Sequence, residues 1–158
     1  MLVIGSQAAH GSILGDLPPE ALRSIEIDIA AFDDPDGSKA DLIDGAIGEA
    51  SLFQARFSFY VQGVSQATAI LPDGWRERLV RYETPATNGV AAWCLDLHDL
   101  WVSKALAGRP KDLEFCRAFL SRELVLRDVL RDRLNNVTGV PDAVLSKAMR
   151  LASWAEDA

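Results

Sequence analysis

The chain has few of the residues that build disulfide frameworks or zinc sites. Its 158 residues include only two cysteines and two histidines. Cys94 and Cys116 do not form a CxxC pair, and their spacing relative to the histidines does not suit a zinc site. We therefore expect a reduced, cytoplasmic protein without a dedicated zinc site.

Long hydrophobic runs are also missing from the sequence. No apolar stretch approaches the roughly 20 residues that are needed to cross a bilayer. The first residues, MLVIGSQAAHG, lack the basic segment and the long apolar segment of a signal peptide. Both absences predict a protein without a membrane partner.

The composition is that of a folded protein with an uneven distribution of charge. With 49% hydrophobic and 25% charged residues, we expect one folded domain over residues 1–158. Residues 1–70 contain ten Asp/Glu and three Lys/Arg, whereas residues 71–158 contain thirteen of each. An acidic protein is a poor general binder of nucleic acid. The acidic half suits divalent cations, or it is a solvated surface that aids solubility.

The order of the expected elements predicts an α+β fold, since strands come first and helices last. An antiparallel or mixed sheet from about residues 1–95 would be backed by the helical residues 96–158. Gly5-Ser6 would end the first strand in a tight turn, followed by a helix or turn over residues 7–14. Alternation and turn residues predict strands at 1–4, 25–30, 57–61, 67–71, 78–82 and 90–95, and helices at 38–51, 96–107, 111–134 and 141–154.

Glu26 and Asp28 are two carboxylates inside the hydrophobic run SIEIDIAAF. Residues i and i+2 of a strand point to the same face, about 6.6 Å apart. Two carboxylates at that separation repel each other unless a cation lies between them, and Mg²⁺ binds through one or two carboxylates plus substrate phosphates. Mn²⁺ would suit the same oxygens. The alternative is an exposed edge strand on which acidic residues discourage edge-to-edge pairing.

Gly5-Ser6 follows the first expected strand directly. A glycine in such a turn allows a ligand to approach the backbone closely, and backbone N–H groups at a following helix start can bind phosphate. The Ser6 hydroxyl would add a further donor. A tight turn between strand and helix without any ligand is the alternative.

Lys104 lies on the inner face of the helix expected at residues 96–107. Leu97, Leu100 and Trp101 form one apolar stripe by their spacing, and Lys104 continues this stripe. A lysine on such a face either extends its amine to solvent or reaches a bound triphosphate. Asp112, eight residues later, would cap the next helix or orient Lys104.

Several segments of residues 1–120 form a recognisable set: GS, SIEIDI, FYVQGV, ATAILPDGWRERLV and CLDLHDLWVSKALAGRPKD. Taken together they resemble a bacterial family of nucleotidyltransferase-like proteins. That family is similar to the AbiEii-type nucleotidyltransferase toxins of toxin–antitoxin systems. The most specific parts of the resemblance are LPDGW and CLDLHDLWVSKALAGRPKD.

The resemblance implies a nucleotidyltransferase-like fold and a role for each matching residue. In the superfamily the Gly-Ser turn holds the nucleotide phosphates, and the acidic pair holds the metal ion. Carried over to this chain, Gly5, Ser6, Lys104 and Arg109 would bind the nucleotide, and Glu26 and Asp28 would bind Mg²⁺ or Mn²⁺. Lys104 and Asp112 would be the catalytic residues, with Asp112 as a catalytic or orienting carboxylate.

The chain departs from the superfamily pattern at the acidic site. It has Glu-x-Asp where active members more often have Asp-x-Asp, and the gap between Gly5-Ser6 and this pair is longer than usual. Two residues, Glu83 and Asp96, are candidates for a third carboxylate. These departures keep open a catalytically silent protein with a binding or regulatory role, such as an antitoxin subunit.

The expected activity is Mg²⁺-dependent transfer of a nucleoside monophosphate from an NTP, with pyrophosphate as the leaving group. The resemblance implies a tRNA 3′ end or a protein hydroxyl as the acceptor, and a role as a toxin–antitoxin component with a cognate partner. A structural domain whose acidic strand is merely exposed is the third reading of the same residues.

Overall fold

The computed structural model describes residues 1–154 and contains a five-stranded mixed sheet. The strand order is β3-β2-β1-β5-β4. β1 pairs antiparallel with β2 and parallel with β5, while β2 and β3 are parallel and β4 and β5 are antiparallel. The strands are β1 (Leu2–Val3), β2 (Glu26–Ala30), β3 (Tyr60–Gly63), β4 (Val80–Tyr82) and β5 (Ala92–Cys94).

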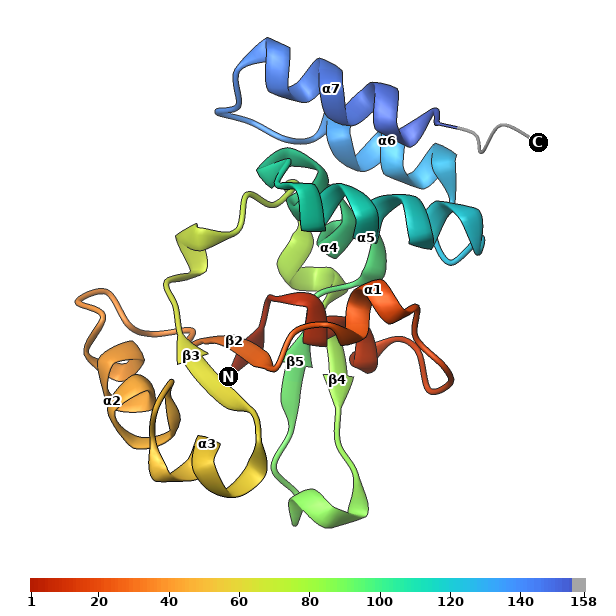
Figure 1. The fold of residues 1–158 in the computed structure, drawn as a ribbon. Coiled ribbons are helices and arrows are strands. Elements are labelled where there is room, and N and C mark those ends of the chain that lie inside the picture. The colour runs from red at the N-terminus through yellow and green to blue at the C-terminus, as the bar shows by residue number, and fades with distance from the viewer. Residues whose placement is uncertain (155–158) are drawn as a thin grey trace.

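Helices cover two separate parts of this sheet (Figure 1). Four helices form a layer at one end, where α4 packs against α5, α6 and α7. They are α4 (Leu97–Ala107), α5 (Pro110–Ser121), α6 (Arg127–Asn135) and α7 (Asp142–Ala152). The others are α1 (Pro19–Leu22), α2 (Ser38–Ile47) and α3 (Leu52–Phe57), with short 3₁₀ helices η1 (Ser6–Gly11), η2 (Gln66–Thr68), η3 (Trp75–Arg78) and η4 (Pro85–Thr87).

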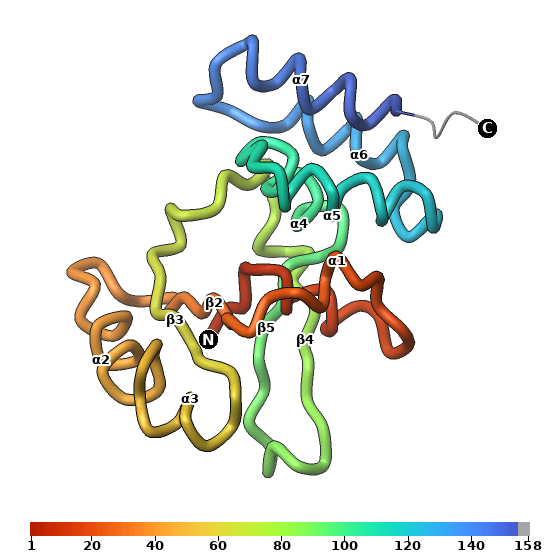
Figure 2. Tube along the Cα trace, in the orientation of Figure 1, coloured from red at the N-terminus to blue at the C-terminus, as the bar shows by residue number. Residues whose placement is uncertain are grey.

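The hydrophobic core lies where β1 and β5 meet α4 and its neighbours. Trp101 is fully buried on α4, and its indole N–H donates to the backbone oxygen of Cys116 at 3.0 Å. The rings of Phe115 and Phe119 stack in α5 with centroids 4.0 Å apart. The hairpin of β4 and β5 extends away from this helical layer (Figure 2). None of the helices within residues 1–154 is both long and apolar enough to span a bilayer.

The edge strand β3 is covered by α2, and two contacts explain how. The N–H of Gly63 donates to Asp44 Oδ1 at 2.7 Å, which satisfies an edge donor of the strand. A side chain at Gly63 would meet the backbone oxygen of Ala40 at 2.2 Å, so a glycine is needed where α2 crosses β3.

The structure confirms the predicted α+β class and the mixed sheet, and it corrects three elements. Residues 67–71 are not a strand: they contain the end of η2 and three residues outside the sheet, of which Ala69 has extended dihedral angles. The helix expected over residues 111–134 is two helices, α5 and α6. The strand expected at residues 57–61 begins later, at Tyr60, and residues 52–57 form the helix α3.

The break between α5 and α6 has a structural reason that periodicity does not show. Glu123 takes a positive φ of 54°, and the side chain of Val125 is buried in the core. The N–H of Leu126 donates to His98 Nε2 of α4 at 3.0 Å. The chain therefore turns here, and α6 packs against α4 instead of continuing along α5.

Candidate functional site

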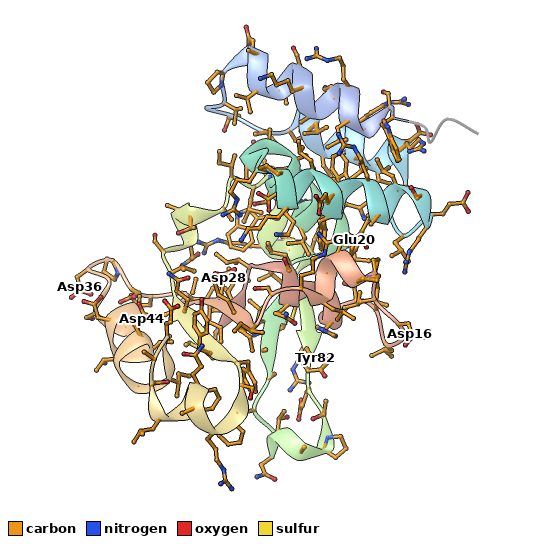
Figure 3. All side chains as sticks on the ribbon, in the orientation of Figure 1. Asp16, Glu20, Asp28, Asp36, Asp44 and Tyr82 are labelled. Atoms are coloured by element: carbon orange, nitrogen blue, oxygen red, sulfur yellow. The ribbon has the colours of Figure 1, made fainter. Side chains whose placement is uncertain are left out.

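A cleft of about 480 Å³ lies between β2, the turn after β1 and the helices α4 and α5. The seven residues to which the sequence analysis assigned metal binding, nucleotide binding or catalysis all line it: Gly5, Ser6, Glu26, Asp28, Lys104, Arg109 and Asp112. In Figure 3, Asp28 and Glu20 lie where the sheet meets the helical layer, whereas Asp16, Asp36 and Asp44 lie at the periphery. Segments far apart in the sequence thus meet at one place.

Glu26 and Asp28 lie together on β2 and interact directly. Burial raises the pKa of Glu26 most, and the hydrogen bond and the negative charge of Asp28 raise it further. The charge of Lys111 and a hydrogen bond from Tyr60 act in the opposite direction. Asp28 therefore disfavours the ionisation of Glu26, as a neighbouring negative charge does.

The raised pKa of Glu26 predicts how the stability of the metal-free protein depends on pH. Folded Glu26 binds its proton more tightly than the unfolded chain, whose pKa is near 4.5. The free energy of unfolding should therefore fall as pH rises from about 4.5 through the folded-state pKa. We expect Glu26→Gln to lose this decrease in urea titrations at a series of pH values. Glu49→Gln, which changes an exposed glutamate, is the control and should keep it; identical profiles for wild type and Glu26→Gln would contradict the prediction.

Gly5 makes room for the Asp28 carboxylate. A Cβ atom at Gly5 would lie 1.9 Å from Asp28 Oδ2 and 2.8 Å from Asp28 Cγ. The backbone of Gly5 has φ −80° and ψ −168°, a conformation open to any residue, so the requirement for glycine is one of space. The sequence suggested that Gly5 allows a ligand to approach the backbone; the structure shows this space filled by Asp28.

Lys104, Arg109 and Asp112 form a charged cluster on the helical side of the cleft. Asp112 is 1% exposed. Its Oδ1 accepts a hydrogen bond from Lys104 Nζ at 3.3 Å, and its Oδ2 accepts one from Arg109 Nε at 2.6 Å. Arg109 Nη2 also donates to Asp112 Oδ1 at 3.2 Å. The Lys104 amine lies 5.1 Å above the ring of Phe115. Lys104 is therefore held inward against a buried carboxylate and does not extend to solvent.

The electrostatics of Asp112 match a carboxylate that orients cations. Burial alone would raise its pKa, but the hydrogen bonds and the positive charges of Arg109 and Lys104 together outweigh burial and leave the pKa below its ordinary value. The same hydrogen bond raises the pKa of the Arg109 guanidinium. A carboxylate held ionised by two cations is a weak proton acceptor, so its position suits orientation better than base catalysis.

The two candidates for a third carboxylate lie outside the cleft. Glu83 pairs with Arg81 at the end of β4. Asp96 caps α4, where its Oδ1 accepts the N–H groups of His98 at 3.0 Å and Asp99 at 3.4 Å. Within residues 1–154, no group of three or more His, Cys, Asp or Glu side chains is arranged to hold a metal ion.

Tyr60 escaped the sequence analysis because only the fold brings it near the acidic pair. It lies beside Glu26 in the parallel register of β2 and β3, and its hydroxyl donates to Glu26 Oε2 at 3.4 Å. The residue pattern of β3 alone carries no signal for this neighbour. Lys111, two residues after Arg109, also lines the cleft.

A second groove adjoins the cleft along α1 and α5. Its volume is about 510 Å³, and it shares Glu20 and Arg23 with the cleft. Arg117, Arg122 and Trp154 line its further part. Arg23 is ion-paired with Glu114. The cleft therefore has one end that continues into a groove with arginines and an indole.

Comparison with known proteins gives one match. The sequence model of the family described as "Nucleotidyltransferase of unknown function (DUF6036)" matches residues 1–156. No curated protein matches the chain, and neither does any solved structure. The match confirms the nucleotidyltransferase-like part of the resemblance, whereas the likeness to AbiEii-type toxins stays a prediction.

Proposed function

Because this chain belongs to the family of nucleotidyltransferases of unknown function (DUF6036), we propose that its cleft binds an NTP with Mg²⁺ or Mn²⁺ and transfers the nucleoside monophosphate to an acceptor. One observation carries the proposal. Two mutually repelling carboxylates, Glu26 and Asp28, lie in the same cleft as four cationic side chains, which are those of Arg23, Lys104, Arg109 and Lys111. A metal ion relieves the repulsion, and the cations suit a polyphosphate.

The donor set of the cleft fits a hard divalent cation. Mg²⁺ needs only one or two carboxylates from the protein when substrate phosphates supply further oxygens. Glu26 and Asp28 would hold the ion, and Gly5 keeps the Asp28 carboxylate in place beside the backbone. When bound, the ion would supply charge neutralisation at the phosphates. The longer side chain of Glu26 is fixed by Tyr60 from the neighbouring strand.

The other residues of the cleft would bind and orient the triphosphate. Lys104 and Arg109, both held by Asp112, present positive charge from α4 and α5, and Ser6 adds a hydroxyl at the start of η1. An acceptor oxygen would attack the α-phosphorus in line, the bond to the oxygen that bridges to the β-phosphate would break, and pyrophosphate would leave. The proton of the acceptor hydroxyl would pass to solvent. Positioning and charge stabilisation would supply most of the catalysis.

The acceptor would enter from the end of the cleft that continues into the second groove. A tRNA 3′ end or a protein hydroxyl fits the resemblance to AbiEii-type toxins, as does a role in a cytoplasmic toxin–antitoxin system with a cognate partner. Arg117 and Arg122 could contact phosphates of such an acceptor. The acidic net charge of −7 argues against general nucleic-acid binding and favours recognition of a defined end.

A catalytically silent protein is the second candidate, and it is favoured because, within residues 1–154, no third carboxylate is grouped with Glu26 and Asp28 to hold a metal ion. Glu83 and Asp96 are engaged elsewhere, and within residues 1–154 no group of three such ligands could hold a metal ion. Such a protein would still bind a metal–NTP complex and act as a binding or regulatory subunit. Metal-dependent NTP binding without transfer would identify it.

Thermal melts with metal and NTP test the binding step. At a ligand concentration of about 100 Kd, binding should add about 2.7 kcal/mol to the free energy of unfolding, which raises the Tm by about 5–10 °C. Mn²⁺ alone should give a smaller increase. No increase with any NTP at millimolar concentration would contradict the proposal and leave a structural domain.

Label transfer separates the active from the silent protein. We expect an α-³²P-labelled NTP, with Mg²⁺, to label a band in total tRNA or in a cell lysate, and γ-³²P label to remain unattached. Wild type that binds NTP but transfers no label to either acceptor pool would favour the silent protein.

A further inference from the structure

Phe115 is a core residue of α5 that contacts a charged side chain of the cleft. It is 1% exposed, and the Lys104 amine lies 5.1 Å from the centroid of its ring. Asp112, which lies one turn earlier on the same helix, accepts a hydrogen bond from this amine at 3.3 Å. Neighbouring side chains of α5 therefore hold the Lys104 amine from two directions.

The ammonium group of Lys104 keeps donors that a ligand in the cleft can use. A lysine ammonium has three N–H groups, and within the described chain only one hydrogen bond is made, to Asp112 Oδ1. The face of an aromatic ring attracts a cation at this distance without being a conventional hydrogen bond acceptor. Because Lys104 also lines the cleft, its remaining donors suit an anionic ligand there.

The charge balance around Asp112 explains why an aromatic ring suits this position. One carboxylate is shared by two cations, since it accepts hydrogen bonds from both Lys104 and Arg109. The three side chains therefore carry one net positive charge, which a phosphate in the cleft can meet. A further carboxylate beside Lys104 would neutralise this charge, whereas the ring of Phe115 attracts the ammonium and leaves the net charge unchanged.

The ring itself is fixed in the core. Phe115 stacks on the fully buried Phe119 with centroids 4.0 Å apart and an angle of 20° between the ring planes. A lysine side chain is flexible and charged, so on its own it would sample several positions. A fixed ring and a buried carboxylate together restrict the Lys104 amine to one place at the wall of the cleft.

We propose that Phe115 is a positioning residue for phosphate binding by Lys104, a proposal that rests on the proposed function. Its ring keeps the ammonium at the wall of the cleft before any ligand arrives, so a phosphate binds without first ordering the lysine side chain. Ordering one long side chain on binding weakens a dissociation constant by about two- to tenfold. The aromatic ring should improve phosphate affinity by a factor in this range.

Two matched substitutions separate this role from packing. Phe115→Leu and Phe119→Leu each remove one ring of the same buried stack, but only the ring of Phe115 lies over Lys104. Isothermal titrations in Mn²⁺ would use inorganic tripolyphosphate as the ligand. Phe115→Leu should bind it about three- to tenfold more weakly than wild type, and Phe119→Leu should bind it like wild type. Equal dissociation constants for the two variants would overturn the proposed role.

Fluorinated rings at position 115 test the electrostatic attraction directly. Mono-, di- and trifluorinated phenylalanine, incorporated at this position, keep the shape of the ring and withdraw electron density from its face. The dissociation constant of tripolyphosphate should rise stepwise with the number of fluorine atoms, and that of Mn²⁺ alone should stay constant. The same series at position 119 should change neither constant. An unchanged affinity for tripolyphosphate across the series at position 115 would reduce Phe115 to a packing residue and overturn the proposal.

The proposal and the proposed function can fail separately. If tripolyphosphate and NTPs bind the wild type but fluorination has no effect, the positioning role is overturned and the proposed function stands. If neither tripolyphosphate nor any NTP binds in the presence of Mn²⁺, the proposed function fails and the role of Phe115 fails with it. If Phe115→Leu does not fold, as judged by circular dichroism, the fluorinated series decides, because it preserves the packing of the core.

Discussion

Gly5→Ala should abolish Mn²⁺-dependent NTP binding while the protein still folds. The added methyl group would lie 1.9 Å from Asp28 Oδ2, so the carboxylate has to leave its present position beside Glu26. Displacement of one of two metal-binding carboxylates should weaken Mn²⁺ binding by at least about 100-fold. Because Asp28 Cγ and Cβ would also be crowded, at 2.8 and 3.1 Å, overpacking should cost about 1–3 kcal/mol of stability. Titration of Mn²⁺ by electron paramagnetic resonance measures the first effect, and urea denaturation measures the second.

The matched control is Gly15→Ala in the loop before α1. Nothing lies within 4 Å of a Cβ atom at Gly15, so this variant should bind Mn²⁺ and NTP like wild type. Normal Mn²⁺ binding by Gly5→Ala would show that Asp28 can move without loss of the site. The pair would then not be the metal site, and the proposed function would lose its main support.

The part of the site that lies within single elements could be predicted from the sequence. Alternation of apolar and acidic residues places Glu26 and Asp28 on one face of a strand, and helical spacing places Lys104 on the inner stripe of α4. The structure brings these residues to one cleft, and the sheet-first, helix-last order is that of an α+β fold. Their roles in metal and nucleotide binding are predictions for the experiments above.

The remaining features depend on tertiary contacts that have no local signal. Tyr60 becomes a neighbour of Glu26 only through the parallel register of β2 and β3. Gly5 leaves space for the Asp28 carboxylate because the turn after β1 lies against β2. In the sequence, a glycine in such a turn is equally consistent with the close approach of a ligand. The turn between α5 and α6 contains neither glycine nor proline, so the sequence predicts one continuous helix there. The structure has a turn instead, in which the N–H of Leu126 donates a hydrogen bond to His98 of α4.

The segment after β3 shows a different limit of pattern reasoning. Residues 67–71 were expected to be a strand, and Ala69 does have extended dihedral angles. The five strands of the sheet do not include this segment, since Gln66 fastens it to the backbone after β2. Local conformation was thus anticipated correctly for Ala69, but pairing was not.

Asp28→Asn should leave the metal-free protein as stable as wild type, or slightly more stable, and abolish metal-dependent NTP binding. The substitution keeps the shape of the side chain and removes the charge that raises the pKa of Glu26. Within residues 1–154 no backbone N–H donates to the Asp28 carboxylate, so no such bond is lost. With one carboxylate left, Mn²⁺ binding should weaken by at least about 100-fold.

A structural role for Asp28 would give the opposite result, which makes the experiment decisive. Removal of an acceptor on which the fold depends would cost about 1–3 kcal/mol and leave the response to metal and NTP intact. Thermal melts of wild type, Asp28→Asn and the exposed control Asp16→Asn, each with and without Mg²⁺ and NTP, distinguish the two roles. Asp16→Asn makes the same charge change in a loop far from the cleft (Figure 3) and should respond to Mg²⁺ and NTP like wild type. If Asp28→Asn melts well below wild type without metal and still gains stability from Mg²⁺ and NTP, Asp28 supports the fold and the metal site lies elsewhere.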